Sequence, residues 1–172
     1  MKATDIIADG FGRIREIVHE AVDGLPAERL NARVDPAANS ITWLVWHLTR
    51  IQDDHVADAG DLKQVWRAGG WADRFALPLP AAATGYGHTA RQVGTVRVDS
   101  GELLLGYHDA VHEQSLRFVR GLAAADLDRV VDERWDPPVT LGVRLVSVLS
   151  DDLQHAGQAA FVRGLLERGA AG

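Results

Sequence analysis

Residues 144–166 read RLVSVLSDDLQHAGQAAFVRGLL, and this stretch decides how the rest of the chain is interpreted. Apolar residues recur along it at helical spacing, so we expect one long helix over residues 140–168. Asp151 and His155 are four residues apart, which places both side chains on one face of such a helix. A carboxylate and an imidazole arranged in this way can bind the same metal ion.

An earlier segment offers a third ligand. Residues 40–59 read SITWLVWHLTRIQDDHVADA and predict a second helix, in which His47 interrupts an apolar run. An inward histidine is more often a hydrogen-bonded core residue than a metal ligand. Together with Asp151 and His155, however, His47 completes a set of two histidines and one carboxylate. Such a set leaves coordination positions open, as catalytic metal sites do.

Two acidic residues bear on this site. Asp152 adjoins Asp151 and lies three residues before His155, which is also a spacing that suits a shared ion, so it competes for the role of carboxylate ligand. Asp54 lies seven residues after His47, nearly in line with it on the helix. It could accept a hydrogen bond from a ligand histidine and orient it, or simply solvate the helix end.

The remaining histidines give alternatives. His108 and His112, in YHDAVHE, have the same four-residue spacing as the proposed pair, but their acidic neighbours indicate a solvated or half-exposed face. His55 follows two aspartates and is expected to be solvated, and His19 is expected at the surface. His88, in the segment TGYGHT, could line a pocket.

The rest of the chain predicts an all-α protein. Helical spacing over residues 4–23 and 97–122 adds two more helices, and no stretch shows strand alternation of useful length. Residues 132–141 read DERWDPPVTL, a proline-rich crossover with little helical character. We therefore expect a single domain over residues 1–172, folded as a four-helix bundle with a long excursion between helices two and three.

The excursion, residues 60–96, is rich in glycine, proline and aromatic residues, and connections this long are often functional. We expect Trp43, the WRAGGW stretch at 66–71 and Tyr86 to border the pocket above the metal. The alternative is that the excursion merely closes one end of the bundle.

Composition excludes several classes of function. The chain has 172 residues, a net charge of −6 and no cysteine. Nucleic acids and anionic membranes attract clustered basic residues, which this sequence does not offer, and no apolar run reaches the length of a membrane span. Without cysteine there is no disulfide, thiolate zinc site or cysteine nucleophile, so thiol chemistry would need a thiol from outside. We expect a cytoplasmic protein.

Two motifs carry a family resemblance. NSITWLVWHLTRIQDDH, ending at His55, and DDLQHAGQAAFVRG, beginning at Asp151, resemble the DinB-like (YfiT-type) superfamily of metal-binding four-helix bundles. The match is closest to the actinobacterial branch of mycothiol-dependent maleylpyruvate isomerase and mycothiol S-transferases. That family has a histidine in helix two and a His-x-x-x-His pair followed by Gly-Gln in helix four. His47, His155 and Gln158 fit this pattern, while Asp151 stands where the mycothiol branch typically has glutamate.

The resemblance implies a divalent ion held by His47, Asp151 and His155, with zinc expected and nickel or iron as alternatives. It also implies a low-molecular-weight thiol, mycothiol, activated at the metal to attack an electrophilic substrate in a transfer or isomerisation reaction. A hydrolase that activates water at the same ion is the alternative enzyme, and a non-enzymatic, stress-associated metal- or ligand-binding bundle is the third possibility. The sequence does not distinguish a monomer from a homodimer.

Side chains around the expected ion would complete the site. Gln158 is a candidate to support or line it. Arg50, Arg144 and Arg163 are available to pair with carboxylates of the thiol or substrate.

Overall fold

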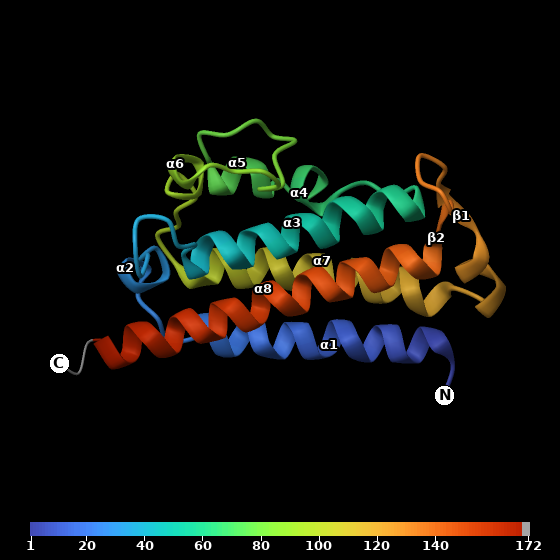
Figure 1. The fold of residues 1–172 in the computed structure, drawn as a ribbon, viewed down its shortest axis with the longest axis horizontal. Coiled ribbons are helices and arrows are strands. Elements are labelled where there is room, and N and C mark those ends of the chain that lie inside the picture. The colour runs from blue at the N-terminus through green and yellow to red at the C-terminus, as the bar shows by residue number, and fades with distance from the viewer. Residues whose placement is uncertain (170–172) are drawn as a thin grey trace.

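The computed structural model describes residues 1–169, and four long helices dominate it (Figure 1). These are α1 (Ala3–Val22), α3 (Ile41–Gly60), α7 (Gly101–Gly121) and α8 (Leu141–Gly169). Each of α1 and α3 packs against both α7 and α8. The predicted all-α four-helix bundle is therefore confirmed. The predicted bounds agree to within a few residues, the largest difference being at α7, where the Ser100 hydroxyl caps the helix by accepting from the Glu102 N–H.

The direction of the helices explains the long excursion. In Figure 1, α1 and α8 run one way and α3 and α7 run the other. Because α3 and α7 are parallel, the chain must travel back along the 20 residues of α3, about 30 Å, before α7 can begin. The returning segment passes over α3 and contains three short helices, α4 (Val65–Ala68), α5 (Trp71–Phe75) and α6 (Ala90–Val93).

Short elements occupy the other connections. Helix α2 (Ala27–Leu30) lies between α1 and α3, and the 3-10 helix η1 (Ala124–Asp128) follows α7. A small antiparallel sheet of β1 (Val130–Asp132) and β2 (Val139–Thr140) then leads directly into α8. The sequence did not predict these strands, because strands of three and two residues are too short to show alternation.

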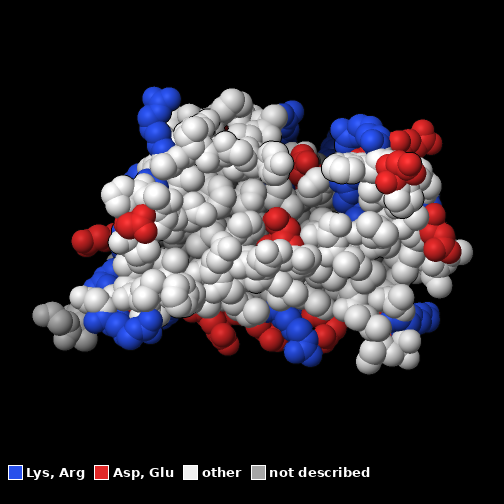
Figure 2. Space-filling model, in the orientation of Figure 1, with Lys and Arg blue, Asp and Glu red and all other residues white. Residues whose placement is uncertain are grey.

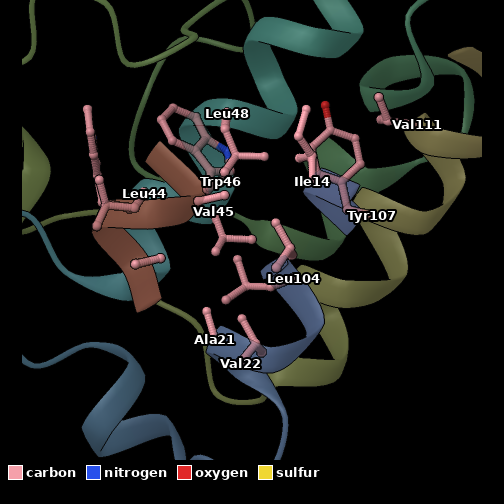
Figure 3. Packing of buried hydrophobic residues seen from close by; sticks show 14 of the residues in the cluster. Ile14, Ala21, Val22, Leu44, Val45, Trp46, Leu48, Leu104, Tyr107 and Val111 are labelled. Carbon is pink, nitrogen blue, oxygen red and sulfur yellow. The ribbon is translucent and has the colours of Figure 1, made fainter. Parts of the chain in front are cut away.

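The core is apolar and continuous across the bundle. Figure 3 shows Ile14 of α1, Trp46 and Leu48 of α3, and Leu104 and Tyr107 of α7 converging, and all five are almost fully buried. The Ser40 hydroxyl accepts the Trp43 N–H and fixes where α3 begins. Among the described residues, no helix combines the length and hydropathy needed to cross a membrane.

The surface carries charges of both signs. On the face drawn in Figure 2, acidic and basic side chains alternate around the edge, and they do not form a broad basic area. This distribution agrees with the net charge of −6.

Candidate metal centre

His47 lies on the buried side of α3, one turn after Trp43. Its imidazole stacks on the Trp43 indole, with ring centroids 4.6 Å apart and planes inclined by 19°. Nδ1 contacts the carbonyl oxygen of Thr84 at 2.5 Å. A carbonyl oxygen only accepts hydrogen bonds, so Nδ1 carries the proton and the Nε2 lone pair stays free. Burial lowers the pKa of His47, which favours the neutral form that binds metal ions.

Gly85 allows Thr84 to approach His47 this closely. Its φ of +97° lies in a region that residues with a side chain rarely adopt. A Cβ atom at this position would lie 2.6 Å from His47 Nδ1 and 3.1 Å from the Trp46 ring. Only glycine fits both the backbone conformation and the available space, so the TGYG segment supports His47 through its backbone.

A buried ion pair fastens the excursion to α3. The Arg50 Nε donates to the carbonyl oxygen of Ala83 at 3.1 Å, next to the residue that contacts His47. The Asp53 carboxylate accepts the backbone N–H groups of Val65 and Trp66 at 2.8 and 2.7 Å. The Arg50 and Asp53 side chains have no exposed surface and lie 3.5 Å apart. Arg50 is therefore committed to the fold, and the expectation that it could bind a small-molecule carboxylate is wrong.

Helix α8 supplies the other two side chains. His155 faces His47, with ring centroids 4.8 Å apart and planes inclined by 74°. The His155 Nδ1 contacts the Gln158 Oε1 at 2.9 Å, which makes Nδ1 the donor and leaves Nε2 free. That Nε2 lies 3.7 Å from the Asp151 Oδ1. The other carboxylate oxygen of Asp151 is buried without a hydrogen-bond partner among the described residues.

These three side chains fit a divalent ion. One donor atom from each of His47, Asp151 and His155 lies within 4.8 Å of the other two. Metal–nitrogen and metal–oxygen bonds of about 2.1 Å would hold ligand atoms about 3.4 Å apart, so only a small contraction is needed. Among the described residues neither His47 Nε2 nor His155 Nε2 makes a hydrogen bond, and the buried Oδ2 of Asp151 lacks the partner that a buried polar atom requires.

The neighbouring acids have different surroundings. Asp152 is fully buried, neither of its oxygens has a partner among residues 1–169, and burial together with Asp151 raises its pKa well above the usual range. It is absent from the cluster, so the carboxylate beside the two histidines belongs to Asp151. Asp54 accepts a hydrogen bond from Gln64 at 2.6 Å. The expectation that Asp54 orients His47 is wrong, because seven residues on a helix separate the two side chains by about 10 Å.

Two expectations about other histidines are wrong. His108 is fully buried and His112 nearly so. His108 Nδ1 contacts the Thr49 hydroxyl at 3.1 Å, and burial lowers its pKa to about 3. The acids beside them in the sequence lie on a different face of α7, so they do not indicate how exposed the two histidines are. His55 is half-buried, and its Nδ1 contacts the Arg144 guanidinium at 2.7 Å.

His88 and His19 each contact a side chain of another element. The His88 Nδ1 accepts the indole N–H of Trp43 at 3.2 Å, so His88 supports the ring that stacks on His47. His19 is partly exposed, as expected, and its Nε2 lies 2.9 Å from Asp109 of α7.

The aromatic residues of the excursion divide into two groups. Trp66 and Trp71 pack against Tyr107 of α7, with ring centroids 5.0 and 5.7 Å apart. The WRAGGW stretch therefore covers the core instead of bordering the pocket, because the Asp53 carboxylate holds its start near the end of α3. Tyr86 is 89% exposed and lines a cavity that also reaches Asp151.

This cavity has a volume of about 390 Å³ and lies between α3, α8 and the β1–β2 hairpin. Ile51, His55, Asp132 and Arg144 form much of its wall. Sequence reasoning singled out Arg144 but not its partners in the hairpin. Arg163 is not available to a ligand in the same way, since it pairs with Glu167 and donates to backbone carbonyls at the end of α1.

Sequence reasoning missed Thr84 and Gly85. The two glycines of TGYG indicate a turn, but nothing in the sequence shows which histidine this turn contacts.

Comparison with known proteins agrees with this fold. The family model of the DinB superfamily matches residues 11–159. A crystal structure described as a conserved protein from Enterococcus faecalis is similar, with a TM-score of 0.90 and 31% sequence identity. The similarity covers 96% of this chain and 98% of that one. A search among curated proteins finds no match. The chain therefore belongs to the DinB superfamily.

Proposed function

We propose that this protein is a divalent-metal-dependent transferase or isomerase that uses a low-molecular-weight thiol. The observation that carries the proposal is the cluster of His47, Asp151 and His155, whose three donor atoms converge and have room for an ion. Membership of a superfamily of often metal-binding bundles supports it. Zinc is the expected ion, and nickel or iron would suit the same ligands.

When bound, such an ion would act as a Lewis acid that lowers the pKa of a thiol or of water. The protein's own side chains would prepare the site for it. Thr84 and Gln158 hold the two imidazoles in the tautomer that leaves Nε2 free. The stacked Trp43 ring covers one side of His47 and limits the access of water there.

The thiol is the finer part of the proposal. The chain has no cysteine, so sulfur chemistry would require a thiol cosubstrate. The resemblance of the DDLQHAGQ motif to the mycothiol-dependent branch suggests mycothiol. The electrophile would be a small molecule such as a Michael acceptor, an epoxide or an activated double bond. The cytoplasm, where thiols are kept reduced, is the compartment that suits this chemistry.

The metal is tested with a matched pair of variants. Asp151→Asn removes the carboxylate of the cluster, whereas Asp152→Asn replaces a buried carboxyl outside the cluster, whose pKa is raised well above the usual range by burial and by Asp151. Elemental analysis after dialysis should find about one ion per chain in the wild type and in Asp152→Asn, and much less in Asp151→Asn. Equal metal content in all three proteins would refute the assignment of ligands.

The thiol is tested on the cobalt-loaded protein. Mycothiol should produce a thiolate-to-cobalt charge-transfer band, and conjugation of an electrophile should require both thiol and metal. If no band appears but metal-dependent ester or amide hydrolysis does, the hydrolase is the correct reading. If neither thiol chemistry nor hydrolysis occurs, a non-enzymatic binding role is favoured.

A further inference from the structure

The cavity beside the candidate metal centre is built in three levels. On α3, His47, Ile51 and His55 follow one another at intervals of four residues, so they lie along one face. On α8, Asp151, Val148 and Arg144 follow at intervals of three and four residues, so they also share one face. Except for His47, all of these residues line the cavity. Seven residues of helix separate Asp151 from Arg144, which is about 10 Å.

The far end of the cavity presents hydrogen-bond donors. The Arg144 Nη1 lies 2.7 Å from His55 Nδ1, and its Nη2 donates to the Asp132 Oδ2 at 2.9 Å. Arginine keeps its charge and only donates, so His55 Nδ1 must accept, and the imidazole proton is on Nε2. Burial and the adjacent Arg144 lower the pKa of His55, which keeps the ring neutral. The guanidinium also has more N–H groups than these two contacts use.

Two arginines and several carboxylates lie at this end of the cavity. Asp132 is shared by two arginines, Arg134 at 2.8 Å and Arg144 at 2.9 Å, and they hold its pKa well below the usual range. The guanidinium groups of Arg134 and Arg144 therefore share the single carboxylate of Asp132. Asp54, Asp58 and Asp61 line a second cavity that shares these arginines, and they oppose an anion from that side.

The middle of the cavity is apolar. Ile51 and Val148 form its floor, and Val139 and Trp135 of the hairpin segment border it. In Figure 2 the surface is hollowed between the excursion and the hairpin. Because the walls are apolar between two polar ends, a ligand that fills the cavity needs an apolar middle section.

We propose that this cavity binds small organic acids, with the carboxylate at Arg144 and His55, an apolar chain along Ile51 and Val148, and the reactive end at the metal centre. The placement of the reactive end rests on the proposed function, whereas recognition of the carboxylate rests on the cavity alone. Arg144 would thus determine specificity for acidic substrates.

The test compares three thiols of equal length on the metal-loaded protein: 6-mercaptohexanoic acid, 6-mercaptohexan-1-ol and 6-aminohexane-1-thiol. Their chains span about 8 Å, from carbon–carbon bonds of about 1.5 Å, which suits the depth of the cavity. Calorimetry should show the acid binding about tenfold more tightly than the alcohol, the value of a hydrogen bond to a charged group, and the amine binding most weakly.

Two variants assign the effect to its residue. Arg144→Gln should abolish the preference for the acid over the alcohol, while Arg117→Gln, at an exposed site on α7, should preserve it. Circular dichroism checks that both variants fold, and the wild-type comparison of the three thiols tests the proposal independently of them.

The outcomes separate this inference from the proposed function. Equal binding of acid and alcohol, tightest binding of the amine, or no binding of any of the three at millimolar concentration would overturn the cavity assignment. If the acid is preferred and requires Arg144, but no thiol gives a charge-transfer band with cobalt, the cavity assignment stands and the thiol function fails.

Discussion

Replacement of Gly85 by alanine tests whether the backbone of the excursion orients His47. The new Cβ atom would lie 2.6 Å from His47 Nδ1, while real Cβ atoms essentially never approach another heavy atom within 3.0 Å. To restore an ordinary contact, the imidazole or the TGYG backbone must move by nearly 1 Å. Such a movement would break the 2.5 Å contact between Nδ1 and the Thr84 carbonyl.

The expected magnitude has two parts. A residue with a side chain at positive φ costs about 1–2 kcal/mol, which should appear as a loss of stability in the metal-free protein. Loss of the group that orients a ligand histidine typically lowers metal affinity by about 10- to 100-fold, or about 1.4–2.7 kcal/mol. The second effect should appear only in the affinity for the ion.

Gly87→Ala is the matched control. Gly87 also has a positive φ, +70°, but a Cβ atom there would meet nothing within 4 Å. Both variants should therefore lose stability in urea unfolding of the metal-free protein, with the larger loss in Gly85→Ala because the clash with His47 adds to the cost of the positive φ. Only Gly85→Ala should lose affinity for zinc in competition with a chelator. Unchanged zinc affinity in Gly85→Ala, or an equal loss in Gly87→Ala, would refute the argument.

Two further predictions concern buried polar groups. Asp53→Ala should lower the free energy of unfolding by about 3 kcal/mol or more, because it leaves Arg50 buried without its ion-pair partner. Asp54→Ala should cost much less, because Asp54 only accepts a hydrogen bond from Gln64. Urea unfolding of both variants measures the difference, and similar values would contradict the prediction. Burial lowers the pKa of His108 from 6.5 to about 3, so between these pH values the unfolded chain binds more protons than the folded chain. The contribution of His108 to stability is therefore complete above about pH 6.5, and the free energy of unfolding falls by about 1.4 kcal/mol per pH unit below it. Between pH 6.5 and 5 the wild type should thus lose about 2 kcal/mol more than His108→Leu in urea titrations, and parallel losses would show that His108 does not titrate in this way.

The fold was largely readable from the sequence, because long helices carry strong periodic signals. The Ser40 cap and the apolar spacing of α8 placed two helices to within a few residues. The direction of the helices was not readable, since periodicity carries no information on which neighbours are parallel. The hairpin at 130–140 was missed because its strands, of three and two residues, are too short to show alternation.

Contacts between site residues that are close in sequence were predictable, whereas contacts between distant residues were not. Asp151, His155 and Gln158 lie within two turns of one helix, so their spacing alone placed them together. Thr84 lies 37 residues from His47, and the contact depends on how the excursion returns over α3. The same holds for Asp132 and Arg144, which meet only after the hairpin has folded beside α8.

The errors about the histidines share one physical cause. His55 and His108 were assigned to solvated faces because acids adjoin them in the sequence, but adjacent residues on a helix are rotated by about 100°. The relevant neighbours of His108 are Leu104 and Val111, both buried, and the relevant neighbour of His55 is Ile51. The two Asp-Asp pairs follow the same rule.

In each Asp-Asp pair, one carboxylate enters the interior and the other faces a cavity. Asp53 is buried and anchors the excursion, while Asp54 lines the second cavity. Asp152 is buried in the bundle, while Asp151 joins the candidate metal centre. The residues adjacent in sequence therefore do not indicate whether a helical residue is buried, whereas the residues three and four positions away do. Applied to α3 and α8, that spacing places His47, Ile51 and His55 on one face and Asp151, Val148 and Arg144 on another, and the packing of α3 against α8 brings the two faces together at the cavity on which the binding of an organic acid depends.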